Sequence, residues 1–67
     1  MNRTEYMQAA AIALSDACSA PLESSHAEAL LGDAWDLAQA EANTQADFDR
    51  VMKVACLHTA RMLRDLA

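Results

Sequence analysis

The stretch QADFDRVMKVACLHTARMLRDLA, residues 45–67, decides the fold. Its apolar and small residues recur at alternating intervals of four and three, which is the spacing of one face of an α-helix. We therefore predict a helix over about residues 45–66 that packs at a shallow angle against a long antiparallel partner. The expected inward stripe consists of Phe48, Met52, Ala55, Thr59, Met62 and Leu66, and it is widened by Val51 and Leu63.

A second helix is predicted near the N-terminus, over about residues 3–19. Asn2 and Glu5 form a capping pair at its start, because an Asn side chain can accept from an exposed backbone N–H of the first turn. The helix ends before Pro21, since the residue preceding a proline is pushed out of helical geometry. Its expected inward stripe consists of Met7, Ala10, Ala11, Leu14, Ala17 and Cys18.

The third helix is predicted over about residues 26–42, with Ser25 and Glu28 as its capping pair. Thr44 and Asp47 form a further cap that separates it from the helix over 45–66, although one helix with a kink at 43–44 is the alternative. Its expected inward stripe consists of Ala27, Leu30, Leu31, Ala34, Leu37 and Ala38, with Trp35 at the edge.

These patterns predict an all-α fold of one domain, residues 1–67, with a three-helix arrangement. It is built on an antiparallel helical hairpin of helices 26–42 and 45–66, and helix 3–19 folds against this hairpin or against a second subunit. The composition agrees, because alanine is the commonest residue and there is one Gly and one Pro. A chain of 67 residues buries only about 60% of its unfolded surface, so we expect a homodimer or a larger homo-oligomer.

The chain has no stretch that approaches the roughly 20 apolar residues of a membrane span. Its first ten residues, MNRTEYMQAA, contain no long apolar run. We therefore expect a cytoplasmic protein that does not bind a membrane, with Cys18 and Cys56 reduced.

Cys56 and His58 suggest a metal or nucleophile site at first sight. Their side chains, however, point about 200° apart around a helix, and no metal-binding residue lies three or four positions from either. Cys56 is expected to be partly buried and His58 to lie beside the core as a hydrogen-bonded residue. The single glycine, Gly32, lies within a predicted helix and forms no phosphate-binding loop. No catalytic residue, metal site or cofactor is predicted, and an enzyme is not expected.

Charge is distributed unevenly along the chain, and this points to a contact surface. Residues 1–49 contain nine acids and one base, whereas residues 50–67 contain four bases and one acid. The bases surround a leucine on the outer side of helix 45–66, and we name this surface the basic face: Arg50, Lys53, Leu57, Arg61 and Arg64, with Val54 alongside. The outer side of helix 26–42 is small and acidic, with Ala29, Gly32, Asp33, Asp36 and Ala40. The basic face and this acidic side are either ordinary solvated surfaces, or one of them docks on the other across a subunit boundary.

The segments EALLGDAWDLAQAEA (28–42) and HTARMLRDLA (58–67) resemble the hairpin pattern of short uncharacterised helical proteins of pseudomonads. They also resemble small acidic helical proteins with which phages inhibit host machinery. The resemblance covers about two thirds of the chain and rests on the spacing of Leu and Ala. It implies a helical hairpin that acts by binding, and it transfers no functional residue.

The expected function is therefore that of a small non-catalytic module that binds another protein stoichiometrically. The resemblance suggests a phage or mobile-element inhibitor of a host system. The basic face is the expected contact surface, and Trp35 and Tyr6 are further candidates because an aromatic residue at a helix edge often anchors an interface. One alternative is an oligomer that binds a small anionic ligand such as a nucleotide, with Arg61 and Arg64 as clamps. Another is an acidic DNA mimic; direct binding of nucleic acid is not expected, because the acidic body would repel phosphates.

Overall fold

The computed structural model describes residues 2–66, which form three α-helices and no strand. The helices are α1 (Arg3–Cys18), α2 (Ser24–Glu41) and α3 (Gln45–Leu66). The expected all-α class is therefore confirmed. None of these helices is both long enough and apolar enough to cross a membrane.

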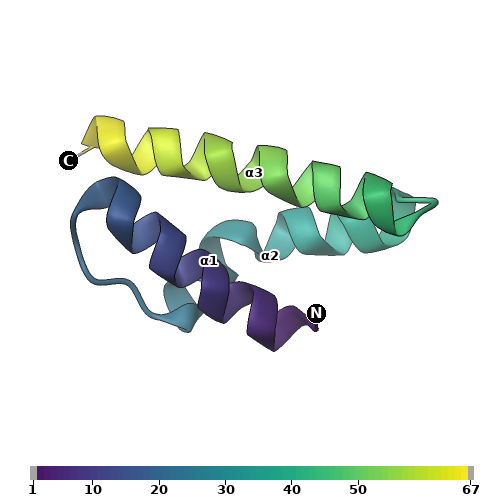
Figure 1. Cartoon of the computed structure of the whole chain (residues 1–67), viewed down its shortest axis with the longest axis horizontal. Helices are drawn as coiled ribbons and strands as arrows, with labels where there is room; N and C mark the ends of the chain where they lie inside the picture. The colour runs from purple at the N-terminus through teal and green to yellow at the C-terminus, as the bar shows by residue number, and fades with distance from the viewer. Residues whose placement is uncertain (1, 67) are drawn as a thin grey trace.

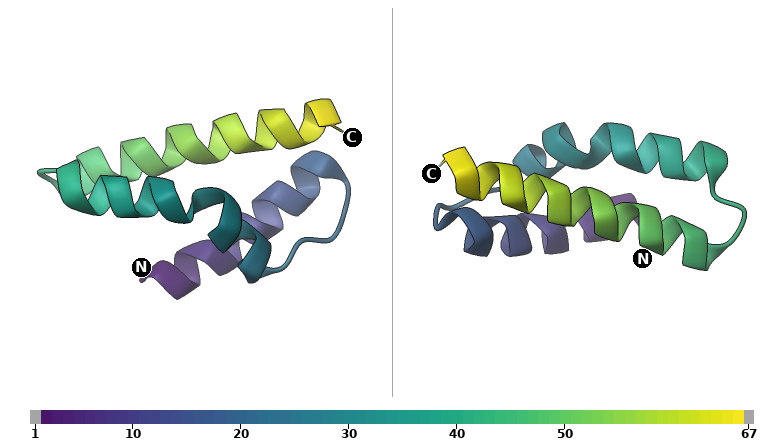
Figure 2. Two further views of the ribbon diagram at one scale, coloured as in Figure 1. Left: turned by 180° about the vertical axis from the view of Figure 1, so that it is seen from behind. Right: turned by 90° about the horizontal axis from the view of Figure 1, so that it is seen from above.

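Each helix packs against both of the others, so α1 is an integral part of the core. Figure 1 shows α3 reversing direction after α2, while α1 approaches α3 near the C-terminal end of α3 and diverges from it toward the N-terminus of α1. The view from above in Figure 2 shows α3 lying across the seam between α1 and α2. This divergence of α1 leaves a surface on α3 that the site described below occupies.

Local signals in the sequence set the helix starts. The Glu5 backbone N–H donates to Asn2 Oδ1 at 2.8 Å, and the Asp47 backbone N–H donates to Thr44 Oγ1 at 3.1 Å. Both predicted caps are thus confirmed, and the cap at Thr44 separates α2 from α3.

The predicted cap of α2 is wrong, because α2 begins two residues earlier than expected. Its N-cap is Glu23, and the Glu23 backbone N–H donates to His26 Nδ1 at 3.0 Å. His26 at the third helical position therefore takes the role that a glutamate fills in the usual capping box. Ser25, the expected cap, lies inside the first turn.

A short linker joins α1 to α2 and is held by one side chain. Ser19 ends α1 in the left-handed conformation, with φ 56°. The Ser15 hydroxyl donates to the Ala11 carbonyl at 2.7 Å and accepts from the Leu22 backbone N–H at 2.8 Å. This hydroxyl anchors the linker so that Leu22 packs, half-buried, against the core.

The core is a small cluster of aliphatic, sulfur-containing and aromatic side chains. The stripe predicted for α1 is confirmed at its first four positions and is half-buried at its last two, Ala17 and Cys18. The buried apolar residues are Met7, Ala10, Ala11, Leu14, Ala27, Leu31, Trp35, Ala38 and Met52.

The stripes predicted for α2 and α3 are wrong in part. Leu30, Leu37, Met62 and Leu66 were expected inside and are exposed, as is Val51. Trp35, expected at the edge, is only 6% exposed, and Gly32 is buried instead of lying on an outer face. Leu63 and the partly buried Cys56 pack against the core as expected, and Ala60 is the residue of α3 that packs there without having been predicted.

Candidate interaction surface

Three aromatic rings, one from each helix, meet where α1 diverges from α3. The ring centroids of Tyr6 and Trp35 lie 5.3 Å apart, and those of Trp35 and Phe48 lie 4.7 Å apart in an edge-to-face arrangement. Such pairs contribute about 0.5–1.5 kcal/mol each beyond the area that they bury. The Tyr6 hydroxyl donates to the Met52 carbonyl at 3.3 Å. Trp35 therefore forms the floor of this region, with Tyr6 and Phe48 on either side of it.

An open groove of about 810 Å³ lies over this aromatic cluster. We name it the aromatic groove, and its polar residues stand at the rim, where Lys53 and Asp49 are both exposed. It is lined by Tyr6, Trp35, Gln45, Phe48, Asp49, Met52, Lys53, Cys56 and Leu57. An apolar floor with a few charged groups at the edge is the usual construction of a binding site.

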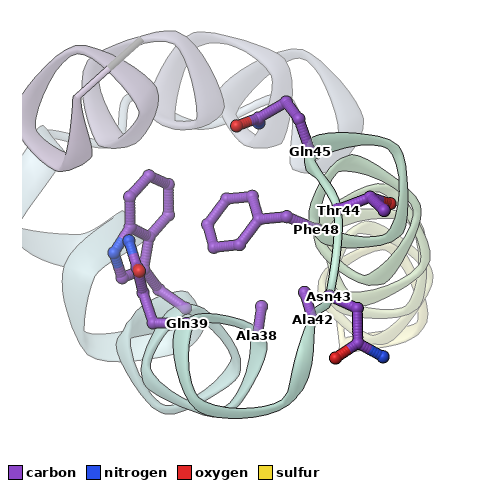
Figure 3. Close-up of a pocket in the computed structure, with 8 residues that line it drawn as sticks. Ala38, Gln39, Ala42, Asn43, Thr44, Gln45 and Phe48 are labelled. Carbon is purple, nitrogen blue, oxygen red and sulfur yellow. The ribbon is translucent and has the colours of Figure 1, made fainter.

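A smaller hollow of about 260 Å³ lies on the other side of the aromatic cluster, beside the turn between α2 and α3. Figure 3 shows the Phe48 ring projecting into this space from α3, with Ala38 and Gln39 on the facing helix. Its other residues are Ala42, Asn43, Thr44 and Gln45, and Trp35 borders both this hollow and the groove. Backbone and amide groups dominate it, so it suits water better than an apolar ligand.

The basic face is exposed along α3 at all five of its positions. Leu57 is 63% exposed and lies beside Val54, which is 61% exposed, so the basic face contains an apolar patch. Arg50 is paired with Asp47 of its own helix at 2.9 Å, whereas no salt bridge within residues 2–66 uses Lys53, Arg61 or Arg64. Three cations are therefore available for a partner from outside this part of the chain.

The basic face and the aromatic groove are continuous. Lys53 and Leu57 belong to both, and Leu57 also borders a shallow depression lined by Val54, His58, Arg61 and Arg64. Four of the seven residues expected to contact a partner (Tyr6, Trp35, Lys53 and Leu57) thus line a single groove. Arg61 and Arg64 lie in the adjoining depression, and Arg50 lies in neither.

The small acidic face of α2 is already partly occupied. Arg3 Nε donates to Glu28 Oε1 at 2.8 Å and Arg3 Nη1 to Asp36 Oδ1 at 2.6 Å, and a second Arg3 nitrogen also contacts Glu28. These hydrogen bonds, to Glu28 first and then to Asp36, raise the pKa of the Arg3 guanidinium. Gly32 lies beneath it, since an added Cβ there would come within 3.1 Å of Arg3 Nη2. The sequence alone did not reveal this bridge.

Cys56 and His58 lie apart, as their spacing predicted. Cys56 is half-buried in the aromatic groove, and this burial raises the pKa of its thiol. His58 is exposed in the basic depression, so the expectation that it would lie beside the core is wrong. No group of three His, Cys, Asp or Glu side chains within residues 2–66 is placed to hold a metal ion.

Sequence reasoning assigned several lining residues of the groove to the core or to no role. Phe48 and Met52 were expected to be buried stripe residues, and Gln45 and Asp49 had no assigned role. One signal in the sequence could have indicated the groove: the chain has three aromatic residues, Tyr6, Trp35 and Phe48, and each lies on a different helix.

No match to this chain is found among known protein families, characterised proteins or solved structures.

Proposed function

We propose that this chain is a small protein-binding module that acts stoichiometrically and recognises an acidic amphipathic helix of its partner. The observation that carries the proposal is the continuity between the aromatic groove and the basic face, through Lys53 and Leu57. A partner helix that inserts an apolar side chain over Tyr6 and Leu57 would place its flanking acids beside Lys53 and Arg61. This is the helix-in-groove mode of recognition, in which apolar anchors provide affinity and charges select the orientation.

The groove suits an apolar anchor for a physical reason. Trp35 is held by rings on both sides, so little side-chain entropy remains to be lost on binding. Leu57 is exposed at the groove edge and gains burial when a helix covers it. A role as inhibitor of a host system rests on the resemblance in Leu and Ala spacing and belongs to the same proposal, because inhibition by binding requires a contact surface of this kind.

The test uses two designed helical peptides and the fluorescence of Trp35, the sole tryptophan of the chain. One peptide has Phe and Leu anchors flanked by Glu, and the other has the same anchors flanked by Lys. We expect saturable binding of the acidic peptide and at least tenfold weaker binding of the basic one. Leu57→Asp and Lys53→Glu should each weaken the acidic peptide at least tenfold, whereas Ile12→Asp, on the outer side of α1, should not.

Any of three results would overturn the proposal. One is equal affinity for both peptides, and another is an unchanged affinity in Leu57→Asp and Lys53→Glu. The third is absence of binding at millimolar acidic peptide.

A second candidate function is supported by the depression of Val54, Leu57, His58, Arg61 and Arg64. Two guanidinium groups beside an imidazole form a site for a phosphate group. Thermal unfolding with millimolar ATP tests this: a rise in the melting temperature that is lost in Arg61→Ala and Arg64→Ala supports it. No rise at all excludes it. The pairing of Glu28 and Asp36 with Arg3 weighs against an acidic DNA mimic, since it neutralises part of the acidic surface.

A further inference from the structure

Four large apolar side chains that the periodicity assigns to the core are exposed along the boundary between α2 and α3. They are Leu30 (40% exposed) and Leu37 (53%) of α2 with Val51 (37%) and Met62 (44%) of α3, and we name them the α2–α3 flank. Leu37 and Val51 line one shallow hollow, which brings the two helices together there. Leu30 lies seven residues before Leu37, and Met62 lies eleven after Val51, so each pair lies on one side of its helix.

The spacing on each helix matches that of a packed interface. On α2 Leu30, Ala34, Leu37 and Glu41 are separated by four, three and four residues, and on α3 Val51, Ala55, His58 and Met62 repeat this pattern, so each helix contributes three apolar residues and one exposed polar residue. Ala34 and Ala55 occupy the central positions and are half-buried. Small residues at these places allow another helix to approach closely, with leucine, valine and methionine on either side.

The whole chain also exposes more surface than its size requires. Its accessible surface is 4633 Å² for a mass of 7.3 kDa. A compact monomer of that mass exposes about 4200 Å². A protein–protein interface of standard size buries about 800 Å² per chain, so a two-fold dimer built on the flank would cover an area larger than this surplus of roughly 400 Å².

The charges on either side of the flank favour a second copy of this chain as the molecule that packs against it. Helix α2 carries four acids and no Lys or Arg, whereas α3 carries four Lys or Arg and three acids. Asp33 and Arg61 are both exposed, on the α2 side and on the α3 side of the flank respectively. If α2 of each copy lies on α3 of the other, acidic and basic margins oppose each other twice. The alternative, α2 on α2, would place acids against acids.

We infer that the α2–α3 flank is the interface of a two-fold homodimer in which α2 of each copy packs on α3 of the other. Val51 points about 200° away from Lys53 around α3, so this interface leaves the aromatic groove, with Lys53 and Leu57, uncovered, and of the basic face only Arg61 lies at its margin. The dimer therefore presents two grooves, and its formation does not depend on the function proposed for them.

Sedimentation equilibrium tests the inference on the full chain at micromolar concentration. We expect the wild-type chain to have twice the mass of the 7.3 kDa chain. Leu37→Gln and Met62→Gln should each raise the dimer dissociation constant at least tenfold. Ile12→Gln and Leu57→Gln are the matched controls, because they remove exposed apolar side chains outside the flank and should leave that constant unchanged.

A charge exchange provides the second test and does not depend on apolar residues. Asp33→Lys and Arg61→Glu should each weaken the dimer, and the double variant should recover affinity, because the opposed charges are then restored in reverse. Circular dichroism confirms that each variant keeps its helix content. A wild-type chain that is monomeric at high micromolar concentration overturns the inference. So does a dimer that Leu57→Gln dissociates while Leu37→Gln does not, or a double variant as weak as its single parents.

Discussion

At the scale of single residues, Ser19 is the position where the backbone conformation and the side chain conflict. Its φ of 56° lies in the left-handed region, which glycine adopts without cost and other residues adopt at about 1 kcal/mol or more. We predict that Ser19→Gly raises the free energy of unfolding by about 0.5–1 kcal/mol. For a domain of this size this corresponds to a rise of roughly 4 °C in melting temperature, measurable by circular dichroism.

The matched control for Ser19→Gly is Ala13→Gly, at an exposed position inside α1. Glycine there loses about 1 kcal/mol of helix propensity relative to alanine. The two substitutions should therefore move the melting temperature in opposite directions. A fall in both variants would show that Ser19 makes a favourable contact which outweighs its backbone conformation.

Tyr6 and Cys56 predict that the protein is less stable in alkaline solution. Burial raises the pKa of both groups above their ordinary values of 10.0 and 9.0, and for Tyr6 the nearby Cys56 and Asp49 add to the effect. A raised pKa means that the folded state holds its proton more tightly than the unfolded state. The contribution of these two protonated groups to the free energy of unfolding is therefore complete below about pH 9. It is lost as the pH rises through their pKa values in the folded state.

The measurement is urea unfolding at neutral pH and above about pH 10. The wild-type midpoint should fall between the two conditions, and the fall should be smaller in Tyr6→Phe and Cys56→Ala. Tyr6→Phe should also lose about 0.5–1.5 kcal/mol at neutral pH, because the hydrogen bond to the Met52 carbonyl is absent. An equal alkaline loss in the wild-type chain and in both variants would contradict this account.

At the scale of helices, Gly32 shows how one side chain from α1 determines the composition of α2. Arg3 lies over Gly32 to reach Glu28 and Asp36. A Cβ at position 32 would lie 3.1 Å from Arg3 Nη2 and 3.3 Å from Glu28 Oε1, which are the far ends of flexible side chains. Because these atoms can move and an exposed ion pair contributes less than about 1 kcal/mol, the gain in helix propensity of about 1 kcal/mol should prevail.

We therefore predict that Gly32→Ala stabilises the protein by up to about 1 kcal/mol, measured by urea unfolding. Introducing the same change into an Arg3→Met background separates the two effects. The gain should be larger in that background, since no guanidinium has to move. A destabilised Gly32→Ala in both backgrounds would show that the close approach of the helices, and not Arg3, requires glycine.

Local signals made the helices predictable, whereas the rotation of each helix about its axis was not. Caps at Asn2 and Thr44 depend on neighbouring residues and were read correctly. On α2 the neighbouring helices cover the side that carries Leu31 and Trp35, and Leu30 and Leu37 lie outside that side and are exposed. On α3 both α1 and α2 pack against the helix, Ala60 lies against the core, and Met62 is exposed.

At the scale of the whole molecule, the candidate site follows from the way α1 crosses α3. Lys53 and Leu57 were predicted as contact residues from helix periodicity alone, and they do lie on an exposed surface. Their union with Tyr6 and Trp35 in one groove depends on where α1 diverges from α3 (Figure 1). That crossing results from the packing of all three helices and has no local signal in the sequence.

The same aromatic cluster should make the three helices unfold together. Trp35 contacts Tyr6 of α1 and Phe48 of α3, and it is almost fully buried. Replacing a buried tryptophan by alanine costs about 3–5 kcal/mol. A domain of 67 residues has roughly 3–10 kcal/mol of stability at about 0.05–0.15 kcal/mol per residue. Trp35→Ala should therefore remove most of the helical signal in circular dichroism at room temperature.

Two comparisons determine whether the loss is due to the cluster. Trp35→Phe keeps a ring between Tyr6 and Phe48 and should retain a cooperative transition with a smaller loss of stability. Ile12→Ala removes an exposed apolar side chain and should change the free energy of unfolding by no more than about 0.5 kcal/mol. If Trp35→Ala keeps most of its helix content and unfolds at the wild-type midpoint, the three helices are held together elsewhere, and the floor of the groove is not part of the cooperative core.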